Sequence, residues 1–136
     1  MEEEKEIRLL ASQLNAMISA AEIATDDGKE ICGFLIDNGY FLSMVQVRNK
    51  EKLIGKSAFY VSEVRRLVKA VKVLGCEIVG TFHSHPMSGA NLSKGDIDSS
   101  EDDDLVLIIS TPKKEEKLWY INKNKGSREI KFELLP

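Results

Sequence analysis

The stretch Glu77-Ile-Val-Gly80-Thr-Phe-His83-Ser-His85-Pro86 is an apolar run that ends in two histidines and a proline. Such a run is typical of a buried strand, and side chains two residues apart on a strand project from the same face. We therefore expect His83 and His85 to face the same side, where two imidazoles can share one metal ion. Pro86 cannot donate a hydrogen bond to a central ladder, so the strand is expected to end there.

Ser93 and Asp96 follow the histidines after a short loop. The spacing Ser-x-x-Asp resembles a capping box, which predicts a helix that begins after Ser93 and holds Asp96 in its first turn, facing the strand end. Two nitrogen ligands and one oxygen ligand leave the fourth position to water, as in catalytic zinc sites, whereas structural zinc sites have four protein ligands. The alternative interpretation is a pair of structural histidines and a plain helix cap. These histidines are the only two in 136 residues, which favours the metal site.

The same residues match a known family. The pattern Gly80-x-x-His-Ser-His-Pro, followed by Ser-x-x-Asp96, resembles the signature of the JAMM, or MPN-plus, metalloproteases. In that family an upstream glutamate followed by x-x-Gly is the general acid/base, and Glu30-Ile-Cys-Gly33 matches it. The resemblance extends over nearly the whole chain. It departs from the family at Leu92, where a proline often precedes the motif serine, and this departure bears on the rigidity of the loop.

The resemblance implies one zinc ion (Zn2+) per chain, held by His83, His85 and Asp96. It also implies that Glu30 is the general acid/base and that Ser93 donates a hydrogen bond to the reaction's oxyanion. The fold that it implies is the MPN fold, which is similar to that of cytidine deaminases. This is an α/β (α+β) fold, in which helices flank a mixed, curved sheet, and we expect residues 1–136 to form one such catalytic domain.

The activity implied by the resemblance is zinc-dependent hydrolysis of the bond that follows the C-terminal tail of a ubiquitin-like or sulfur-carrier protein conjugate. Ser84, between the histidines, resembles the branch that cleaves ubiquitin and ubiquitin-like modifiers. The chain has room only for the bare domain, which favours the short prokaryotic type. One alternative is a non-catalytic MPN scaffold, although such relatives typically lack the ligands. Another is a nucleic-acid-associated member, whose motif usually reads His-Asn-His.

Composition is that of an ordinary globular domain, with 43% hydrophobic and 30% charged residues. The net charge of −3 argues against nucleic acid as a partner, because phosphate binding normally leaves a basic surface. No apolar run is long enough to span a membrane, and the acidic start of the sequence is unlike a signal peptide. We therefore expect a cytoplasmic protein that does not associate with membranes. Cys32 and Cys76 are expected to be small buried hydrophobes, with a redox or disulfide role for Cys32 as the weaker alternative.

Local patterns outside the motif predict the remaining elements. They are an amphipathic helix from Ile7 to Ala21 that ends at the turn cluster Thr25–Gly28, a hairpin of 31–37 and 40–47 joined by a two-residue turn at Asn38-Gly39, a charged loop 48–56, a helix capped by Ser62 that ends near Gly75, a central strand 105–109, a strand 118–121, a turn 123–126 and a final strand 130–134. The acidic run Glu101–Asp104 is expected to end the Ser93 helix as a solvated segment, with contact to a basic substrate tail as the weaker alternative.

Overall fold

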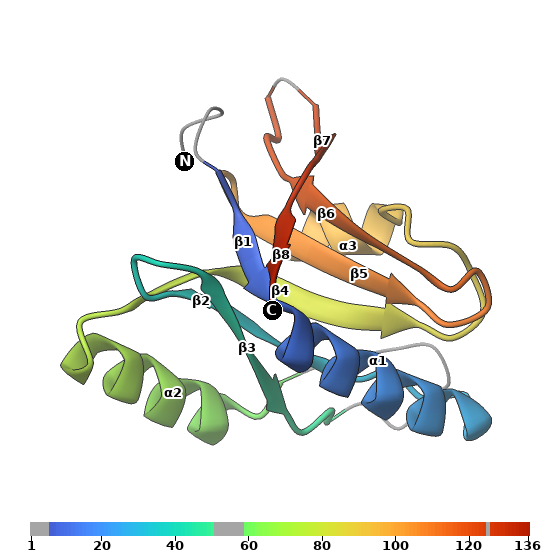
Figure 1. Cartoon of the computed structure of the whole chain (residues 1–136), viewed down its shortest axis with the longest axis horizontal. Coiled ribbons are helices and arrows are strands. Elements are labelled where there is room, and N and C mark those ends of the chain that lie inside the picture. Colours follow the sequence, from blue (N-terminus) through green and yellow to red (C-terminus); the bar gives the residue numbers. More distant parts are fainter. Residues whose placement is uncertain (1–5, 51–58, 125) are drawn as a thin grey trace.

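The computed structural model of the chain describes residues 6–50, 59–124 and 126–136. Within these ranges, helices flank one eight-stranded sheet (Figure 1). The elements are β1 (Arg8–Leu10), α1 (Ala11–Asp26), β2 (Cys32–Asp37), β3 (Leu42–Val47), α2 (Val61–Val73), β4 (Glu77–His85), α3 (Lys94–Ser99), β5 (Leu105–Ser110), β6 (Glu115–Tyr120), β7 (Arg128–Ile130) and β8 (Glu133–Leu135). Because it contains both antiparallel and parallel pairs, the sheet is mixed, as predicted.

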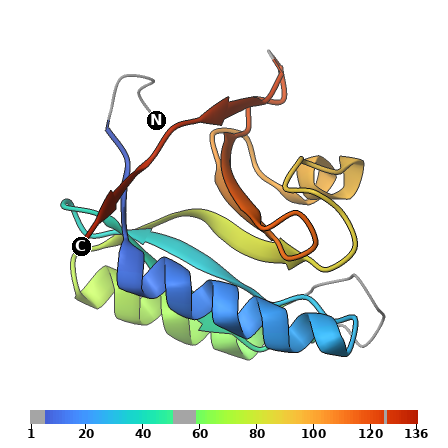
Figure 2. The same ribbon diagram turned by 45° about the vertical axis from the view of Figure 1, so that its right-hand side comes forward.

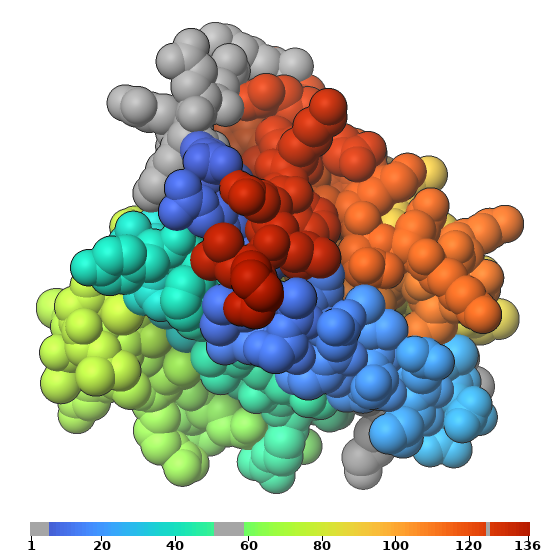
Figure 3. Space-filling view, in the orientation of Figure 1, coloured from blue at the N-terminus to red at the C-terminus, as the bar shows by residue number. Residues whose placement is uncertain are grey.

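The strand order is β7-β6-β5-β4-β2-β3-β1-β8, which places the last two strands of the chain at opposite edges of the sheet. Yet β7 ends at Ile130 and β8 begins at Glu133, so the two edges must lie close together. The sheet is therefore curled, and the C-terminal segment runs across its open side (Figure 2). In the space-filling view this segment lies against β1 and the start of α1 (Figure 3).

This curling corrects the prediction of a single final strand from 130 to 134. The segment is split, with β7 antiparallel to β6 and β8 parallel to β1. The alternation of apolar and charged residues is the same on both halves, so it predicts extended structure but not the change of partner. The preceding strand β6 is also longer than predicted, because it begins at Glu115 and not at Leu118.

The core lies on both faces of β5, which is buried at every position as predicted for a central strand. Leu105, Leu107 and Ile109 belong to the larger cluster, which also contains Leu14 and Ala21 of α1. Val106 and Ile108 belong to a smaller cluster under the loop that precedes α3. The histidine strand β4 is the parallel neighbour of β5, and His83 is paired with Ile108. The histidines therefore lie on the face of the smaller cluster.

The first helix begins later than its apolar spacing predicted. Arg8–Leu10 is a strand, and α1 starts at Ala11. Ile7 and Leu9 are both buried, which is the two-residue alternation of a strand, and Leu9 is paired with Leu42 of β3 and Leu134 of β8. Ladder hydrogen bonds to two neighbouring strands stabilise the extended backbone here, against the helical tendency of the local sequence.

The predicted hairpin is confirmed, but its loop is longer than a two-residue turn. Asp37 pairs with Leu42, which leaves residues 38–41 in the loop. The side-chain oxygen of Asn38 accepts hydrogen bonds from the backbone N–H groups of Tyr40 (2.9 Å) and Phe41 (3.0 Å), and Gly39 adopts a φ of 93°. The asparagine therefore acts by capping the loop, which tolerates two more residues than predicted.

The second helix begins at Val61, so Ser62 lies inside it and is not its cap. The cap residue is Tyr60, whose backbone is extended and whose side chain makes no capping bond. The ring of Phe59 packs on that of Phe34, with centroids 4.6 Å apart, and this contact holds the entry to α2 against the sheet. The helix ends near Gly75 as predicted, with a φ of 71° at that glycine.

The other predicted boundaries agree with the structure. α3 ends at Ser99, just before the acidic run, and Gly126 closes the turn before β7 with its N–H bonded to the carbonyl of Asn122 (2.9 Å). The charged loop predicted at 48–56 lies mostly outside the described residues. Among the described residues, no helix has the length and apolar character needed to cross a membrane.

Candidate metal centre

The structure brings His83, His85 and Asp96 together. The histidines occupy the last positions of β4, and Asp96 lies in the first turn of α3, as the sequence predicts. Their ligand atoms all lie within 4.8 Å of one another. The three side chains are only 9–13% exposed, so the group is a largely enclosed one and not a surface cluster.

The spacing of the ligand atoms fits a tetrahedral metal ion. His83 Nε2 lies 2.9 Å from Asp96 Oδ1, His85 Nε2 lies 3.2 Å from Asp96 Oδ2, and the two Nε2 atoms are 3.2 Å apart. Ligands about 2.0–2.1 Å from one zinc ion at tetrahedral angles are themselves about 3.3 Å apart. The separations of 2.9–3.2 Å among the two Nε2 atoms and the carboxylate oxygens that face them are therefore those of neighbouring ligands in one coordination shell.

The tautomer of His85 supports the same interpretation. His85 Nδ1 lies 2.8 Å from the carbonyl oxygen of Gly89, which can only accept a hydrogen bond, so Nδ1 carries the proton. In neutral His85 the Nε2 atom then carries a lone pair and faces a carboxylate oxygen of Asp96. Two electron-rich atoms in contact need a cation between them, either a proton on His85 or a metal ion. The ligand chemistry thus fits a metal as well as the spacing does.

The carboxylate of the group carries the charge that a metal site requires. Burial favours the neutral acid, but hydrogen bonds with His83 and His85 outweigh it and hold the pKa of Asp96 far below its ordinary range. Burial likewise opposes a charged His85, yet its bonds to Asp96 and the Gly89 carbonyl outweigh this and raise the pKa of His85. Asp96 is therefore a carboxylate at any physiological pH, which is the form that binds metal.

Ser93 fixes the orientation of the Asp96 carboxylate through a complete capping box. Its hydroxyl accepts a hydrogen bond from the Asp96 N–H (3.0 Å), and its own N–H donates to Asp96 Oδ2 (2.8 Å). The predicted cap is confirmed. Ser93 is exposed, and a hydroxyl that accepts one hydrogen bond can still donate another, so capping leaves its proton available.

Glu30 lies beside this group, two residues before the start of β2. Cys32 is paired with His83 in the antiparallel β2–β4 ladder, so extending the register by two residues brings Glu30 level with His85. Glu30 is 8% exposed, and its negative charge contributes to the raised pKa of His85. The structure therefore places this carboxylate at the end of the ladder where the metal ligands lie.

Two polar side chains hold the Glu30 segment through contacts that the sequence did not predict. The buried hydroxyl of Ser84 accepts a hydrogen bond from the N–H of Ile31 (2.9 Å), and the Ser84 N–H donates to the Ile31 carbonyl (3.1 Å). The side-chain amide of Asn49 donates to the Glu30 carbonyl (3.0 Å). For Ser84 the sequence did contain a signal, because strand alternation turns its side chain to the face opposite the histidines and so away from the metal ligands.

The two glycines of the motif are explained by packing. A Cβ atom on Gly80 would lie 1.9 Å from the carbonyl oxygen of Leu105 in β5. A Cβ atom on Gly33 would lie 2.2 Å from the carbonyl oxygen of Val45 and 2.4 Å from the Phe82 ring. Neither position can hold a side chain, so these glycines allow the strands that carry the site to approach one another.

Both cysteines are free. Cys32 is 1% exposed, and burial, together with the negative charges of Glu30 and Glu63, raises the pKa of its thiol to about 11. Cys76 is only half-buried, so the expectation that both cysteines are buried holds for Cys32 alone. The thiol of Cys32 therefore stays protonated at neutral pH, which supports its interpretation as a small buried hydrophobe and disfavours a redox role.

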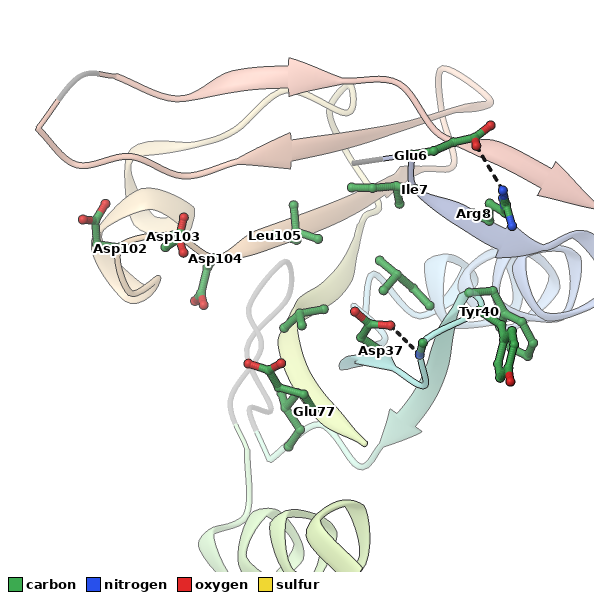
Figure 4. Close-up of a pocket in the computed structure, with 15 residues that line it drawn as sticks. Glu6, Ile7, Arg8, Asp37, Tyr40, Glu77, Asp102, Asp103, Asp104 and Leu105 are labelled. Atoms are coloured by element: carbon green, nitrogen blue, oxygen red, sulfur yellow. Dashed lines mark hydrogen bonds and ion pairs between the residues drawn. The ribbon is translucent and has the colours of Figure 1, made fainter. Parts of the chain in front are cut away.

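A pocket of about 870 Å³ lies at the other end of the same strands (Figure 4). Its lining includes Glu77, the first residue of β4, whereas the histidines are at the last positions of that nine-residue strand. At about 3.3 Å per residue the two ends are roughly 26 Å apart. Asp102, Asp103 and Asp104 line this pocket, so the acidic run lies away from the metal ligands. Its interpretation as a solvated helix end is the better one.

Comparison with known proteins identifies the family of the chain. Residues 11–122 match the family described as prokaryotic homologs of the JAB domain. The chain belongs to this prokaryotic JAB family. No curated protein matches the chain. The JAB match covers α1 to β6 and so includes every residue of the candidate metal centre.

Solved structures resemble this JAB domain over almost its full length. A protein from Desulfitobacterium hafniense is 27% identical with a TM-score of 0.79, and the match covers 95% of this chain and 92% of that one. A JAB1/MPN domain protein from Archaeoglobus fulgidus is 17% identical with a TM-score of 0.62, covering 97% and 100%. A structure described as JAMM, a metalloprotease-like zinc site in the proteasome and signalosome, is 18% identical with a TM-score of 0.55, covering 97% and 100%. The last two show the fold alone, and this fold is the one expected from the sequence.

Proposed function

We propose that this JAB domain, residues 1–136, is a zinc metallo-isopeptidase or peptidase that cleaves after the C-terminal tail of a ubiquitin-like or sulfur-carrier protein. The observation that carries the proposal is the near-equal spacing of His83 Nε2, His85 Nε2 and the Asp96 carboxylate, at 2.9–3.2 Å, beside the buried Glu30. A metal site with a purely structural role would not need the Glu30 carboxyl group at the end of the β2–β4 ladder.

His83, His85 and Asp96 are the residues that hold the metal in this proposal. When bound, zinc lowers the pKa of water to about 7 and polarises a carbonyl group. The chain then has to move a proton and stabilise negative charge. Glu30, as a carboxylate, accepts a proton from the attacking water and returns it to the departing amine, which is otherwise a poor leaving group. Ser93 donates a hydrogen bond from its hydroxyl to the oxyanion that forms on the former carbonyl oxygen.

The substrate class rests on family membership. Ser84 contributes less than its place in the motif implied, because its side chain is fully buried and bonded to Ile31. It positions the segment next to Glu30 and does not contact a modifier directly. The proposed partner is a folded ubiquitin-like protein whose extended tail adds as a strand near the site. The expected location is the cytoplasm, which the two free thiols fit.

The test is cleavage of purified ubiquitin-like conjugates, both isopeptide-linked and linear, by zinc-loaded protein. We expect cleavage that stops with a chelator and returns with added zinc. Glu30→Gln keeps the shape of the side chain and removes the base, so it should remain folded and zinc-loaded while losing about 10²–10⁴-fold in rate. Glu22→Gln, an exposed change on α1, is the matched control and should retain full activity.

Three outcomes would redirect the proposal. A parent protein that binds no zinc and cleaves nothing supports the scaffold alternative. Glu30→Gln activity within a few-fold of the parent removes Glu30 from the mechanism. Equal turnover of a free tail peptide and of the intact conjugate indicates a general peptidase, because binding of a folded modifier then contributes nothing.

A further inference from the structure

The loop 86–92 connects the last metal ligand of β4 to the cap of α3. It contains Gly89, whose carbonyl oxygen accepts the hydrogen bond from His85 Nδ1 (2.8 Å) and thereby sets which nitrogen of His85 faces the metal site. Its own sequence supplies little stiffness at this point, because Gly89 is flexible and Leu92 stands where the related family often has proline. Another part of the chain must therefore hold the Gly89 carbonyl in place.

The β5–β6 hairpin holds the loop on both sides of Gly89. Glu115 Oε2 accepts a hydrogen bond from the Ala90 N–H (3.0 Å), and the indole N–H of Trp119 donates to the Ala90 carbonyl (2.9 Å). The hydroxyl of Ser110 donates to the Ser88 carbonyl (2.6 Å). The backbone is thus bonded immediately before and immediately after the glycine.

Burial makes these contacts stiff. Ala90 is fully buried and belongs to the smaller core cluster, against which Trp119 and Leu92 pack. Ser110 is 1% exposed, at the end of the fully buried strand β5. A Cβ atom on Gly89 would lie 3.3 Å from Glu115 Oε2, so the loop and the hairpin are already in close contact. Hydrogen bonds in such a setting are stronger and more costly to break than on the surface.

We propose that Ser110, Glu115 and Trp119 are positioning residues of the metal centre. They hold the loop so that the Gly89 carbonyl fixes the tautomer and ring orientation of His85, and so they raise the affinity of the site for zinc. The inference rests on the metal-binding part of the proposed function and does not depend on hydrolysis. Loss of a partner that orients a metal-binding histidine typically costs 10–100-fold in affinity.

The experiment measures the zinc affinity of folded protein by competition with a chromophoric chelator. Trp119→Phe keeps an aromatic ring and removes the N–H donor, and Glu115→Ala removes the acceptor. Each should weaken zinc binding by about 10–100-fold. Glu115→Gln keeps an oxygen that can accept from the Ala90 N–H, so its affinity should return to near that of the parent.

Matched controls come from the same strand. Tyr120→Phe removes a hydroxyl that bonds to Asp103, at the end of β6 away from the histidines, and Glu116→Ala removes the neighbouring carboxylate. Both should bind zinc within about 3-fold of the parent, since neither side chain is hydrogen-bonded to the loop 86–92 among the described residues. Circular dichroism and thermal unfolding of the metal-free proteins, at a temperature well below melting, show that each variant is folded when it is titrated.

Zinc affinities of Trp119→Phe and Glu115→Ala equal to those of the controls would overturn the proposal, and so would a parent that binds no zinc. Where Glu115→Ala does not fold, Ser110→Ala and Trp119→Phe decide the question. Because the titration contains no substrate, its outcome is separate from that of the cleavage assay. A parent that binds zinc but cleaves no conjugate refutes the proposed hydrolysis, while weaker zinc binding by the hairpin variants still supports the positioning role.

Discussion

Ser84→Ala tests whether the serine between the two histidines serves to hold the backbone next to Glu30 in place. Its hydroxyl is fully buried and accepts the hydrogen bond of the Ile31 N–H at 2.9 Å, and Ile31 is 5% exposed. Alanine leaves that N–H buried without its acceptor. The cost of such a group is about 1–3 kcal/mol. For a chain of this size we expect a fall in Tm of roughly 3–10 °C.

The change should also reach the chemistry, because Ile31 is covalently next to Glu30. A loosened Ile31 lets the Glu30 carboxylate move relative to His85, and a displacement of about 1 Å at a reacting group can cost on the order of 10²-fold in rate. We therefore expect kcat of the zinc-loaded variant to fall by about 10-fold or more. KM should change less, since Ser84 is fully buried and therefore out of reach of a substrate.

The assay is thermal and urea unfolding followed by circular dichroism, with zinc content and turnover measured on the same preparations. Ser19→Ala, an exposed change on α1, is the matched control and should stay within about 0.5 kcal/mol of the parent. The reasoning is refuted by a Ser84→Ala protein with an unfolding free energy as close to the parent as that of the control. A normal kcat in a destabilised variant would refute only the link to Glu30.

Three further predictions concern other parts of the site. Ser93→Ala should lose about 1 kcal/mol of stability, because the helix cap is removed, and about 10²–10³-fold in kcat, because the hydrogen bond to the oxyanion is removed. Ser93→Asp should recover the stability but not kcat, since a carboxylate can cap a helix but cannot donate a hydrogen bond. Equal turnover of Ser93→Asp and the parent would show that Ser93 is only a helix cap. Gly80→Ala should be destabilised by at least about 3 kcal/mol, because its Cβ would lie 1.9 Å from a carbonyl oxygen of β5, whereas Gly95→Ala, with nothing closer than 3.8 Å, should melt at or above the parent temperature. Alkylation of native protein at pH 8 should label Cys76 well before Cys32, because raising the pKa of Cys32 from 9.0 to about 11 lowers its thiolate fraction roughly a hundredfold; mass spectrometry that finds Cys32 labelled first would contradict this.

Local sequence patterns were sufficient where neighbouring residues decide the structure. The apolar run from Glu77 predicted β4 and its end at Pro86, and the spacing of Ser93 and Asp96 predicted a cap whose two hydrogen bonds are both present. These features depend on strand alternation and on unsatisfied N–H groups at a helix start, which operate over a few residues. For the same reason the sequence predicts all three ligands, since two lie on one strand and the third lies in the first turn of the next helix.

Contacts between distant segments were decided only by the tertiary structure. Ile7 and Leu10 fit a helical spacing, but pairing with β3 and β8 made Arg8–Leu10 a strand, and the final segment divided between β6 and β1. Local sequence shows which residues are apolar but not which strand each segment pairs with. Ladder hydrogen bonds are the same for any pair of strands, and register depends on the packing of the whole sheet.

The candidate site divides in the same way. The sequence by itself determined the ligand types and their spacing along the chain, because these follow from alternation on β4 and from the cap of α3. Only the tertiary structure placed Glu30 level with His85, bonded Ser84 to Ile31, and brought the β5–β6 hairpin against Gly89. These contacts join residues tens of positions apart, and their geometry exists only once the curled sheet has formed and buried the groups that make them.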